Sequence, residues 1–136
     1  LTHPLTHSLT HTHTHKNRTQ ITEISLKNKT RTRIKHERTT ICDALEVEIP
    51  GQITFPINMK NCKSGISVTD QEVCRAMKYL YEEFYIKAEP SGCVSLAAIL
   101  SNKLNIMNKT VLVTISGGNV DEESFKEYLK LAENHK

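Results

Sequence analysis

The stretch that decides the fold is TVLVTISGGN, residues 110–119. Its first six residues form a continuous, mostly β-branched run, which is typical of an interior strand of a parallel sheet. Ser116 then places a hydroxyl at the end of the strand, and Asn119 adds a second polar side chain. Gly117 and Gly118 between them carry no Cβ atoms that would keep a flat ligand away. The stretch therefore predicts a strand that ends in a turn open to a small molecule.

A second polar turn, EPSG, begins at Glu89. Pro90 suits the first position of a helix, and the apolar residues after it predict a helix to about Leu104 that is buried on nearly every side. YIKA, residues 85–88, predicts a strand just before the turn. Because the carboxyl ends of parallel strands meet at one edge of an α/β sheet, we expect Glu89 and Ser116 at a shared rim.

Each turn also has a purely structural explanation. A Gly-Gly turn before a helix is common, and the helix dipole favours Glu89 at a helix start without any ligand. The two turns in this order and at this separation are more specific than either alone.

The rest of the pattern predicts alternating strands and helices. ISV, residues 66–68, reads as a short strand, and Thr69 and Glu72 have the spacing of a capping box that opens an amphipathic helix. A last helix is expected to begin near Asp121. Residues 45–57 alternate in polarity around a Pro-Gly turn and predict extended segments. This order of elements is that of an α/β fold with right-handed crossovers.

Residues 1–40 differ in composition from the rest of the chain. Leu-Thr-His repeats with a period of four and then His-Thr alternates, as simple-sequence DNA would encode. Eight of the 18 Lys and Arg lie in residues 16–38, opposed there only by Glu23 and Glu37. Such a segment predicts a basic, disordered tail, with a separate unit from residue 41 to 136.

Other functions of this segment are less well supported by its composition. The spacing of His3, His7 and His11 would allow weak metal binding on a helix, but Thr and Pro4 disfavour that helix, so we assign no metal ligands. A nucleic-acid arm would need aromatic residues that are missing here, so we expect no nucleic-acid partner. A mitochondrial transit peptide fits the shortage of acids, although its apolar face would be thin.

The cysteines and the hydropathy pattern favour a protein inside the cell. Cys42, Cys62, Cys74 and Cys93 form no C-x-x-C pair, and we expect reduced thiols packed as small apolar groups. No apolar run approaches the roughly 18 residues of a membrane span, so we expect no membrane partner. A cytoplasmic location is the simplest expectation, with the mitochondrion as the alternative.

Four stretches together resemble one known family. ICDALEVEIPGQITFPI, VTDQEVCRAMKYLYEE, EPSGCVSLAAILSNKL and KTVLVTISGGNVDEESF are similar, in this order, to the carboxyl-terminal part of the large domain of the pyridoxal-phosphate-dependent serine/threonine dehydratases. That group includes serine racemase and belongs to the tryptophan-synthase-β-like superfamily. The resemblance runs from about Ile41 to Leu129. It implies part of a three-layer fold with a parallel sheet.

The resemblance also implies a cofactor, pyridoxal 5'-phosphate, and residues that contact it. Ser116 inherits the hydrogen bond to the pyridine nitrogen, Gly117, Gly118 and Asn119 form the wall beside the ring, and Glu89 lies behind the same end. The family removes the α-proton of serine or threonine and expels the β-hydroxyl, giving a 2-oxo acid and ammonia. A homodimer and an amino acid substrate are implied for the full-length enzyme.

Two motifs of the family are missing from this sequence. The lysine of the S-F-K-x-R-G type and the glycine-rich phosphate loop do not occur, and the nearest stretches, SLKNKT at Ser25 and SFKEY at Ser124, break the motif or its order. We therefore assign no catalytic residue and expect a fragment, from a truncated gene or an incomplete reading of one, that is inactive alone. The alternatives are a non-catalytic binding or regulatory module and a function carried by the basic tail.

Overall fold

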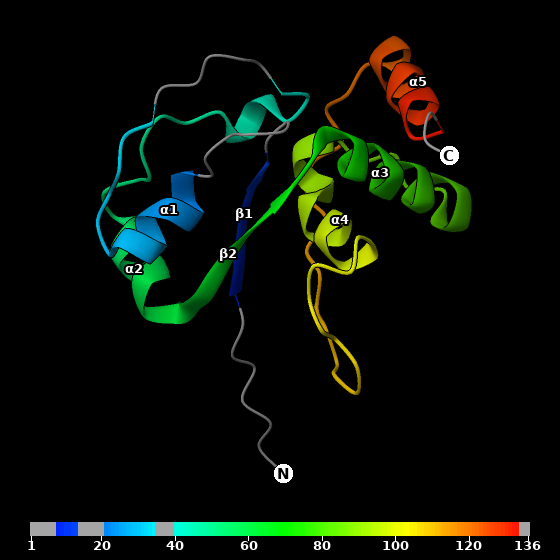
Figure 1. Ribbon diagram of the computed structural model, residues 1–136. Coiled ribbons are helices and arrows are strands. Elements are labelled where there is room, and N and C mark those ends of the chain that lie inside the picture. Colours follow the sequence, from blue (N-terminus) through cyan, green and yellow to red (C-terminus); the bar gives the residue numbers. More distant parts are fainter. Residues whose placement is uncertain (1–7, 14–20, 35–39, 134–136) are drawn as a thin grey trace.

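Helices Asp70–Phe84 (α3) and Val94–Leu100 (α4) pack against each other at the centre of the structure. The computed structural model describes residues 8–13, 21–34 and 40–133, and for residues 8–13 it describes the backbone only. Figure 1 shows the last helix, Glu122–Leu131 (α5), beside α3, and a pair of strands between α3 and α4 on one side and the two helices at the left of the view on the other.

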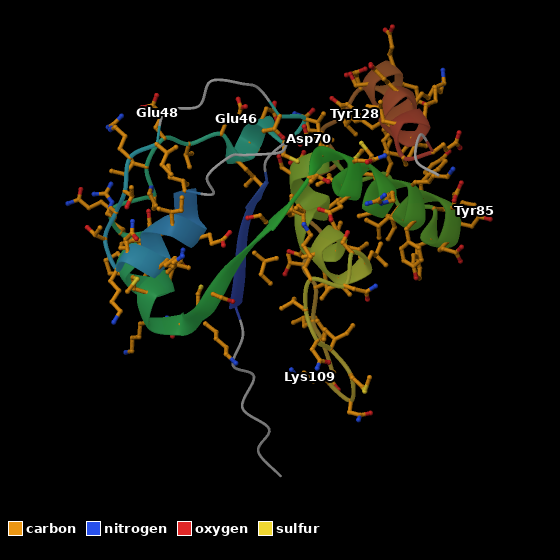
Figure 2. The ribbon with its side chains drawn as sticks, viewed as in Figure 1. Glu46, Glu48, Asp70, Tyr85, Lys109 and Tyr128 are labelled. Carbon is orange, nitrogen blue, oxygen red and sulfur yellow. The ribbon has the colours of Figure 1, made fainter. Side chains whose placement is uncertain are left out.

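Helix α3 begins as its sequence predicts. The Thr69 hydroxyl accepts a hydrogen bond from the Glu72 backbone N–H at 3.2 Å, and the Glu72 carboxylate accepts one from the Thr69 N–H at 2.6 Å. This capping box satisfies two of the amide groups that a helix start leaves unpaired. The helix ends at Tyr85, whose left-handed backbone (φ 56°) turns the chain away, and Figure 2 shows this side chain at the outer end of α3.

The core lies where α3, α4 and α5 meet. The apolar stripe of α3 faces inward, and Phe125 of α5 packs edge-on against Tyr81 with ring centroids 5.2 Å apart. Asp121 caps α5 by accepting a hydrogen bond from the Ser124 N–H at 2.8 Å. The buried members of this core are Cys42, Val68, Val73, Ala76, Met77, Leu80, Ala88, Cys93, Val94, Ala97, Ala98 and Phe125.

The segment that opens at Pro90 is shorter and less buried than the sequence predicts. A 3₁₀ turn, Pro90–Cys93 (η2), precedes α4, and α4 ends at Leu100 rather than Leu104. Asn102 adopts a left-handed conformation (φ 53°), and the Lys103 N–H bonds the Ala98 carbonyl, which is a common way to end a helix. Leu100 is 41% exposed, so the expectation of burial on nearly every side was wrong.

Two parallel strands form the sheet within the described residues. Ser8–His13 (β1) pairs with Cys62–Val68 (β2), and β2 includes the strand predicted at residues 66–68. Helix Ile21–Asn28 (α1) packs on β2 with buried Ile21, Thr22 and Ser25. Gly65 allows this approach, because a Cβ there would lie 2.7 Å from the Glu23 Cα.

The structure therefore differs from the expected disordered tail in residues 8–13 and 21–34. Two arginines of the basic stretch are engaged within the fold: Arg31 Nε donates to the Pro50 carbonyl at 2.8 Å, and Arg33 pairs with Glu48 at 2.5 Å. His3 and His7 lie outside the described residues, and His11 is described only by its backbone. A domain boundary near residue 40 stays a prediction.

Three predicted extended segments have other conformations. Instead of extended chain, residues 45–57 lead from a 3₁₀ turn, Asp43–Leu45 (η1), to helix Thr54–Asn61 (α2). Phe55 of α2 is buried, while Ile57 of α2 and Ile53, the residue before the helix, are exposed, so the three alternating residues do not share one face. Residues 85–88 wrap around the end of α3, where the Ile86 N–H bonds the Leu80 carbonyl.

The run at residues 110–115 is not a strand in this structure. It returns from the loop below α4 toward α5 (yellow to orange in Figure 1), and Lys109 marks the start of this return in Figure 2. Its backbone has no neighbouring strand among the described residues, and Leu112 is 88% exposed. A strand requires a partner for its amide and carbonyl groups, so the β propensity of this run is unused here.

The capping box generates a prediction about pH. Burial raises the pKa of Glu72, but hydrogen bonds from Lys103 and Thr69 outweigh it and hold this pKa below the ordinary 4.5. Because the folded value is the lower one, the carboxylate stabilises the fold fully above pH 4.5 and loses this effect as pH falls through the folded pKa. Lys103 Nζ lies 2.8 Å from the carboxylate, whose side chain is 13% exposed.

We expect Glu72→Gln, which keeps the cap but not the charge, to lower the free energy of unfolding at pH 7 by about 1 kcal/mol. Urea titrations at pH 7 and pH 3 should give a difference from the unsubstituted chain that shrinks at the lower pH. A difference that is the same at both pH values would contradict the assignment. Glu83→Gln on the exposed side of α3 serves as the control.

Candidate functional site

The two polar turns lie side by side. The Glu89 backbone N–H donates to the Gly117 carbonyl at 3.2 Å, and the Glu89 carboxylate accepts a hydrogen bond from the Asn119 N–H at 3.1 Å. The sequence-based expectation that Glu89 and the turn beginning at Ser116 share one rim is confirmed. The physical route differs from the expected one, because neither turn follows a formed strand.

Close backbone packing brings the turns together. A Cβ on Gly92 would overlap the Ser116 carbonyl oxygen and lie 2.8 Å from its carbonyl carbon. Gly117 has φ +76°, a conformation that favours glycine, and a Cβ there would come within 2.5 Å of Glu89 Oε2. Both glycines are therefore required by the contact between the turns, whatever ligand lies outside it.

The chain on the two sides of Glu89 is fixed to the core by two different helices. Pro90, Gly92 and Cys93 are buried and lead directly into α4. On the other side, Lys87 Nζ lies 3.0 Å from Glu122 and 5.3 Å from the centre of the Phe125 ring, which ties the chain before Glu89 to α5. The EPSG turn is thus held at its end by α4 and at its start by α5.

The outer face of the site is accessible. Ser116, Gly117, Gly118 and Asn119 are all exposed, and Glu89 is half-buried. A serine hydroxyl, an amide side chain and two residues without side chains offer hydrogen bonds and a surface that a planar group can approach closely. The arrangement can position such a group, but it contains no nucleophile or general base aligned for catalysis.

Sequence reasoning gave no separate role to Ser91, the third residue of EPSG. Its hydroxyl oxygen is buried and has no hydrogen-bond partner within the part of the chain that the structure describes. An unsatisfied buried hydroxyl costs about 1–3 kcal/mol, which is uncommon in a folded protein. Its position between Glu89 and Gly92 was the signal that could have singled it out.

Cys93 is buried beside the EPSG turn, and the third-position lysines of the SLKNKT and SFKEY stretches lie outside both turns. Burial, followed by the nearby Glu89 charge, raises the pKa of Cys93 to about 12, so this free thiol is an inert packing group at neutral pH. Lys27 is exposed on α1, and Lys126 on α5 pairs with Glu122 at 3.4 Å. Neither lysine lies on the two turns.

The buried thiols behave alike. Burial raises the pKa of Cys74 to about 12 and raises that of Cys42 further still. The expectation of unpaired, packed cysteines is confirmed for these two and for Cys93. Among the side chains that the structure describes, in residues 21–34 and 40–133, no three of His, Cys, Asp or Glu are grouped to hold a metal ion.

Comparison with known proteins identifies the family. Residues 11–117 match the family model described as "Pyridoxal-phosphate dependent enzyme". The chain belongs to this family of pyridoxal-phosphate-dependent enzymes. The match begins 30 residues before the resemblance expected from Ile41 and so includes the second half of β1 and all of α1.

Individual relatives within the pyridoxal-phosphate-dependent family are lyases and racemases. L-threonine ammonia-lyase of Thermotoga maritima is 38% identical over 82 residues, which cover 60% of this chain and 20% of that protein. Serine racemase of Dictyostelium discoideum is 42% identical over 92 residues, which cover 66% of this chain and 28% of that protein. The chain therefore spans less than a third of the length of these two relatives.

Solved structures of the family share the fold. The crystal structure of the Dictyostelium discoideum serine racemase aligns with a TM-score of 0.65 and 39% identity, covering 74% of this chain and 32% of that one. A fungal L-serine ammonia-lyase from Rhizomucor miehei aligns over 92% of this chain and 41% of its own, with a TM-score of 0.73, but at 16% identity it supports the fold alone. The chain has part of the tryptophan-synthase-β-like α/β fold.

The family depends on pyridoxal phosphate, as the motifs implied. Among the described residues, no helix has the length and apolar character needed to cross a membrane.

The backbone contact between the turns predicts the effect of a single methyl group. Gly92→Ala would push residue 116 away, and we expect it to lower the free energy of unfolding by about 1–3 kcal/mol, as overpacking does. Chemical denaturation measures this change. Gly118→Ala is the matched control, since its Cβ would lie 3.3 Å from the Lys87 carbonyl and a small shift relieves the contact. Equal effects of the two substitutions would contradict the contact.

Proposed function

We propose that this chain is part of a pyridoxal-phosphate-dependent ammonia-lyase that acts on serine, threonine or a related hydroxy-amino acid. Ser116, Gly117, Gly118, Asn119 and Glu89 would form the part of the site that holds the pyridine end of the cofactor. The observation that carries the proposal is the hydrogen-bonded contact between the EPSG and SGGN turns in a member of this family.

The residues present fit a planar ring. Gly117 and Gly118 leave the exposed side of the turn without side chains, and the space behind Gly117 is already filled by the Glu89 carboxylate. A ring can therefore approach the outer face of the turn but not the inner one. The Ser116 hydroxyl, at the edge of this face, is a suitable hydrogen-bond partner for a ring nitrogen.

The identity of Ser116 favours elimination chemistry. When bound, pyridoxal phosphate supplies an electron sink for loss of the α-proton and the β-hydroxyl of the amino acid. A neutral hydroxyl does not hold a pyridine nitrogen protonated as a carboxylate would, so Ser116 sets a weaker sink. That setting suits β-elimination to a 2-oxo acid and ammonia.

The sequence of this chain contains neither the lysine motif nor the glycine-rich phosphate loop of the family. Because these motifs would bond and cradle the cofactor, we infer that the chain alone binds the cofactor poorly and is inactive. Mixing the purified chain with pyridoxal phosphate should give no Schiff-base absorbance at the edge of the visible range. Borohydride treatment followed by mass spectrometry that finds one specific lysine modified in full would overturn this inference.

A chimera tests the role of Ser116. In the Dictyostelium discoideum serine racemase, the matching segment would be replaced by the corresponding 66% of this chain. We expect Ser116→Ala in this chimera to lower turnover of serine and cofactor affinity by roughly five- to tenfold, the effect of one lost hydrogen bond. Ser64→Ala, at an exposed position of β2, is the matched control.

The result decides between two functions. Unchanged turnover in the Ser116→Ala chimera would remove Ser116 from the site. A chimera that folds but stays inactive with Ser116 in place would favour the second candidate, a non-catalytic remnant that binds a small ligand or regulates a partner. The missing lysine motif is the observation in favour of that candidate, and cooperative unfolding of the isolated chain would support it.

The remaining features of the complete enzyme are inferred in the same way. We propose an amino acid as substrate, a homodimer as the assembly and the cytoplasm as the location, and no role for nucleic acid. The hydrogen bond of Arg31 to the Pro50 carbonyl and the surface ion pair of Arg33 with Glu48 support the last point.

A further inference from the structure

We propose that Glu89 is a positioning residue that clamps the SGGN turn through the backbone amide of Asn119, and that it thereby fixes Ser116 without contacting the cofactor itself. The role of Ser116 in this statement rests on the function proposed above. The clamp itself is a property of the chain without any ligand.

The clamp consists of two hydrogen bonds from one residue. The backbone N–H of Glu89 donates to the Gly117 carbonyl at 3.2 Å, and its Oε2 accepts from the Asn119 N–H at 3.1 Å. The bonds join the turn on both sides of Gly118, so they fix the direction in which the chain passes residues 117–119. Hydrogen bonds to a charged acceptor are the stronger kind.

The packing around Gly117 places the Glu89 carboxylate where the hydrogen bond to Asn119 does. A Cβ on Gly117 would come within 2.5 Å of Glu89 Oε2, so the carboxylate lies directly against the Gly117 backbone. The positive φ of Gly117 (+76°) turns the chain around this carboxylate. Glycine is therefore required at residue 117 by Glu89 as well as by the backbone conformation.

The groups near Glu89 in the sequence are paired elsewhere or uncharged, so the Glu89 carboxylate bonds the Asn119 amide. Lys87, two residues before Glu89, directs its Nζ to Glu122 at 3.0 Å. Cys93 is buried, and its thiol is neutral at pH 7. The carboxylate of the half-buried Glu89 thus faces the turn at residues 117–119.

Amide hydrogen exchange of the full 136-residue chain, without cofactor, tests the clamp by NMR. We expect Glu89→Ala to speed exchange of the Asn119 amide roughly ten- to hundredfold, which corresponds to losing one charge-assisted hydrogen bond. Glu89→Gln keeps an acceptor oxygen and should restore most of the protection. The Val73 amide, bonded to Thr69 in α3 at 3.0 Å, reports whether the core stays folded, and Glu83→Ala is the surface control.

An unchanged Asn119 exchange rate in Glu89→Ala would overturn the proposal, as would equal acceleration in Glu89→Ala and Glu89→Gln with Val73 protected. If Glu89→Ala also speeds exchange of the Val73 amide, the Asn119 exchange rate of Glu89→Gln is compared with that of the unsubstituted chain. Faster exchange at Asn119 with Val73 protected supports the clamp, and an unchanged rate counts against it. Gly117→Ala adds an independent measurement: its destabilisation should be smaller in a Glu89→Ala background, because the clash with the carboxylate is gone. Strictly additive effects would count against the clamp.

The clamp and the proposed function can fail separately. Loss of Asn119 protection in Glu89→Ala, together with no effect of Ser116→Ala in the chimera, would retain the clamp and reject the cofactor role. Unchanged Asn119 exchange in Glu89→Ala, together with lower turnover of the Ser116→Ala chimera, would retain the cofactor role and reject the clamp.

Discussion

The close backbone approach of Gly92 to residue 116 is the contact on which the rest of the site depends. No side-chain atom fits between them, so the end of one chain segment is held directly against the start of α4. Because α4 packs on α3 through small buried residues such as Ala97 and Ala98, the position of the turn is inherited from the helical core. A change in the packing of that core would therefore shift the exposed turn at residues 116–119, although this turn is not part of the core.

The support of this turn is one-sided. Glu89 and α5 fix residues 117–121, whereas residues 110–115 approach the turn as an extended segment without strand partners among the described residues. The exposed apolar side chains of this run suit the interior of a larger sheet, and the chain spans 28% of the Dictyostelium serine racemase. The pyridine side of the site is thus organised by local contacts, while the strand that leads to it is not.

The amino-terminal forty residues show the limit of composition as a guide to order. Thr-rich, basic sequence with few bulky apolar residues predicts disorder, yet Ile21 and Ser25 are buried against β2. Small residues, Ser25 and Gly65, let this helix and strand approach closely enough that little apolar area is needed. Such a contact depends on two segments, α1 and β2, that lie about forty residues apart, and neither segment predicts the contact by itself.

The sequence by itself determined the features that depend on local chemistry. The capping box at Thr69 and Glu72, the start of α5 at Asp121 and the apolar stripe of α3 all act within a few residues, and the sequence predicted each of them directly. The remaining predictions depended on pairing between segments. Residues 110–115 have strand propensity but no partner strand among the described residues, and Phe55, predicted in an extended segment, lies in helix α2. A strand is stabilised by hydrogen bonds to a neighbour, so only the tertiary structure, which supplies or withholds that neighbour, settles whether it forms.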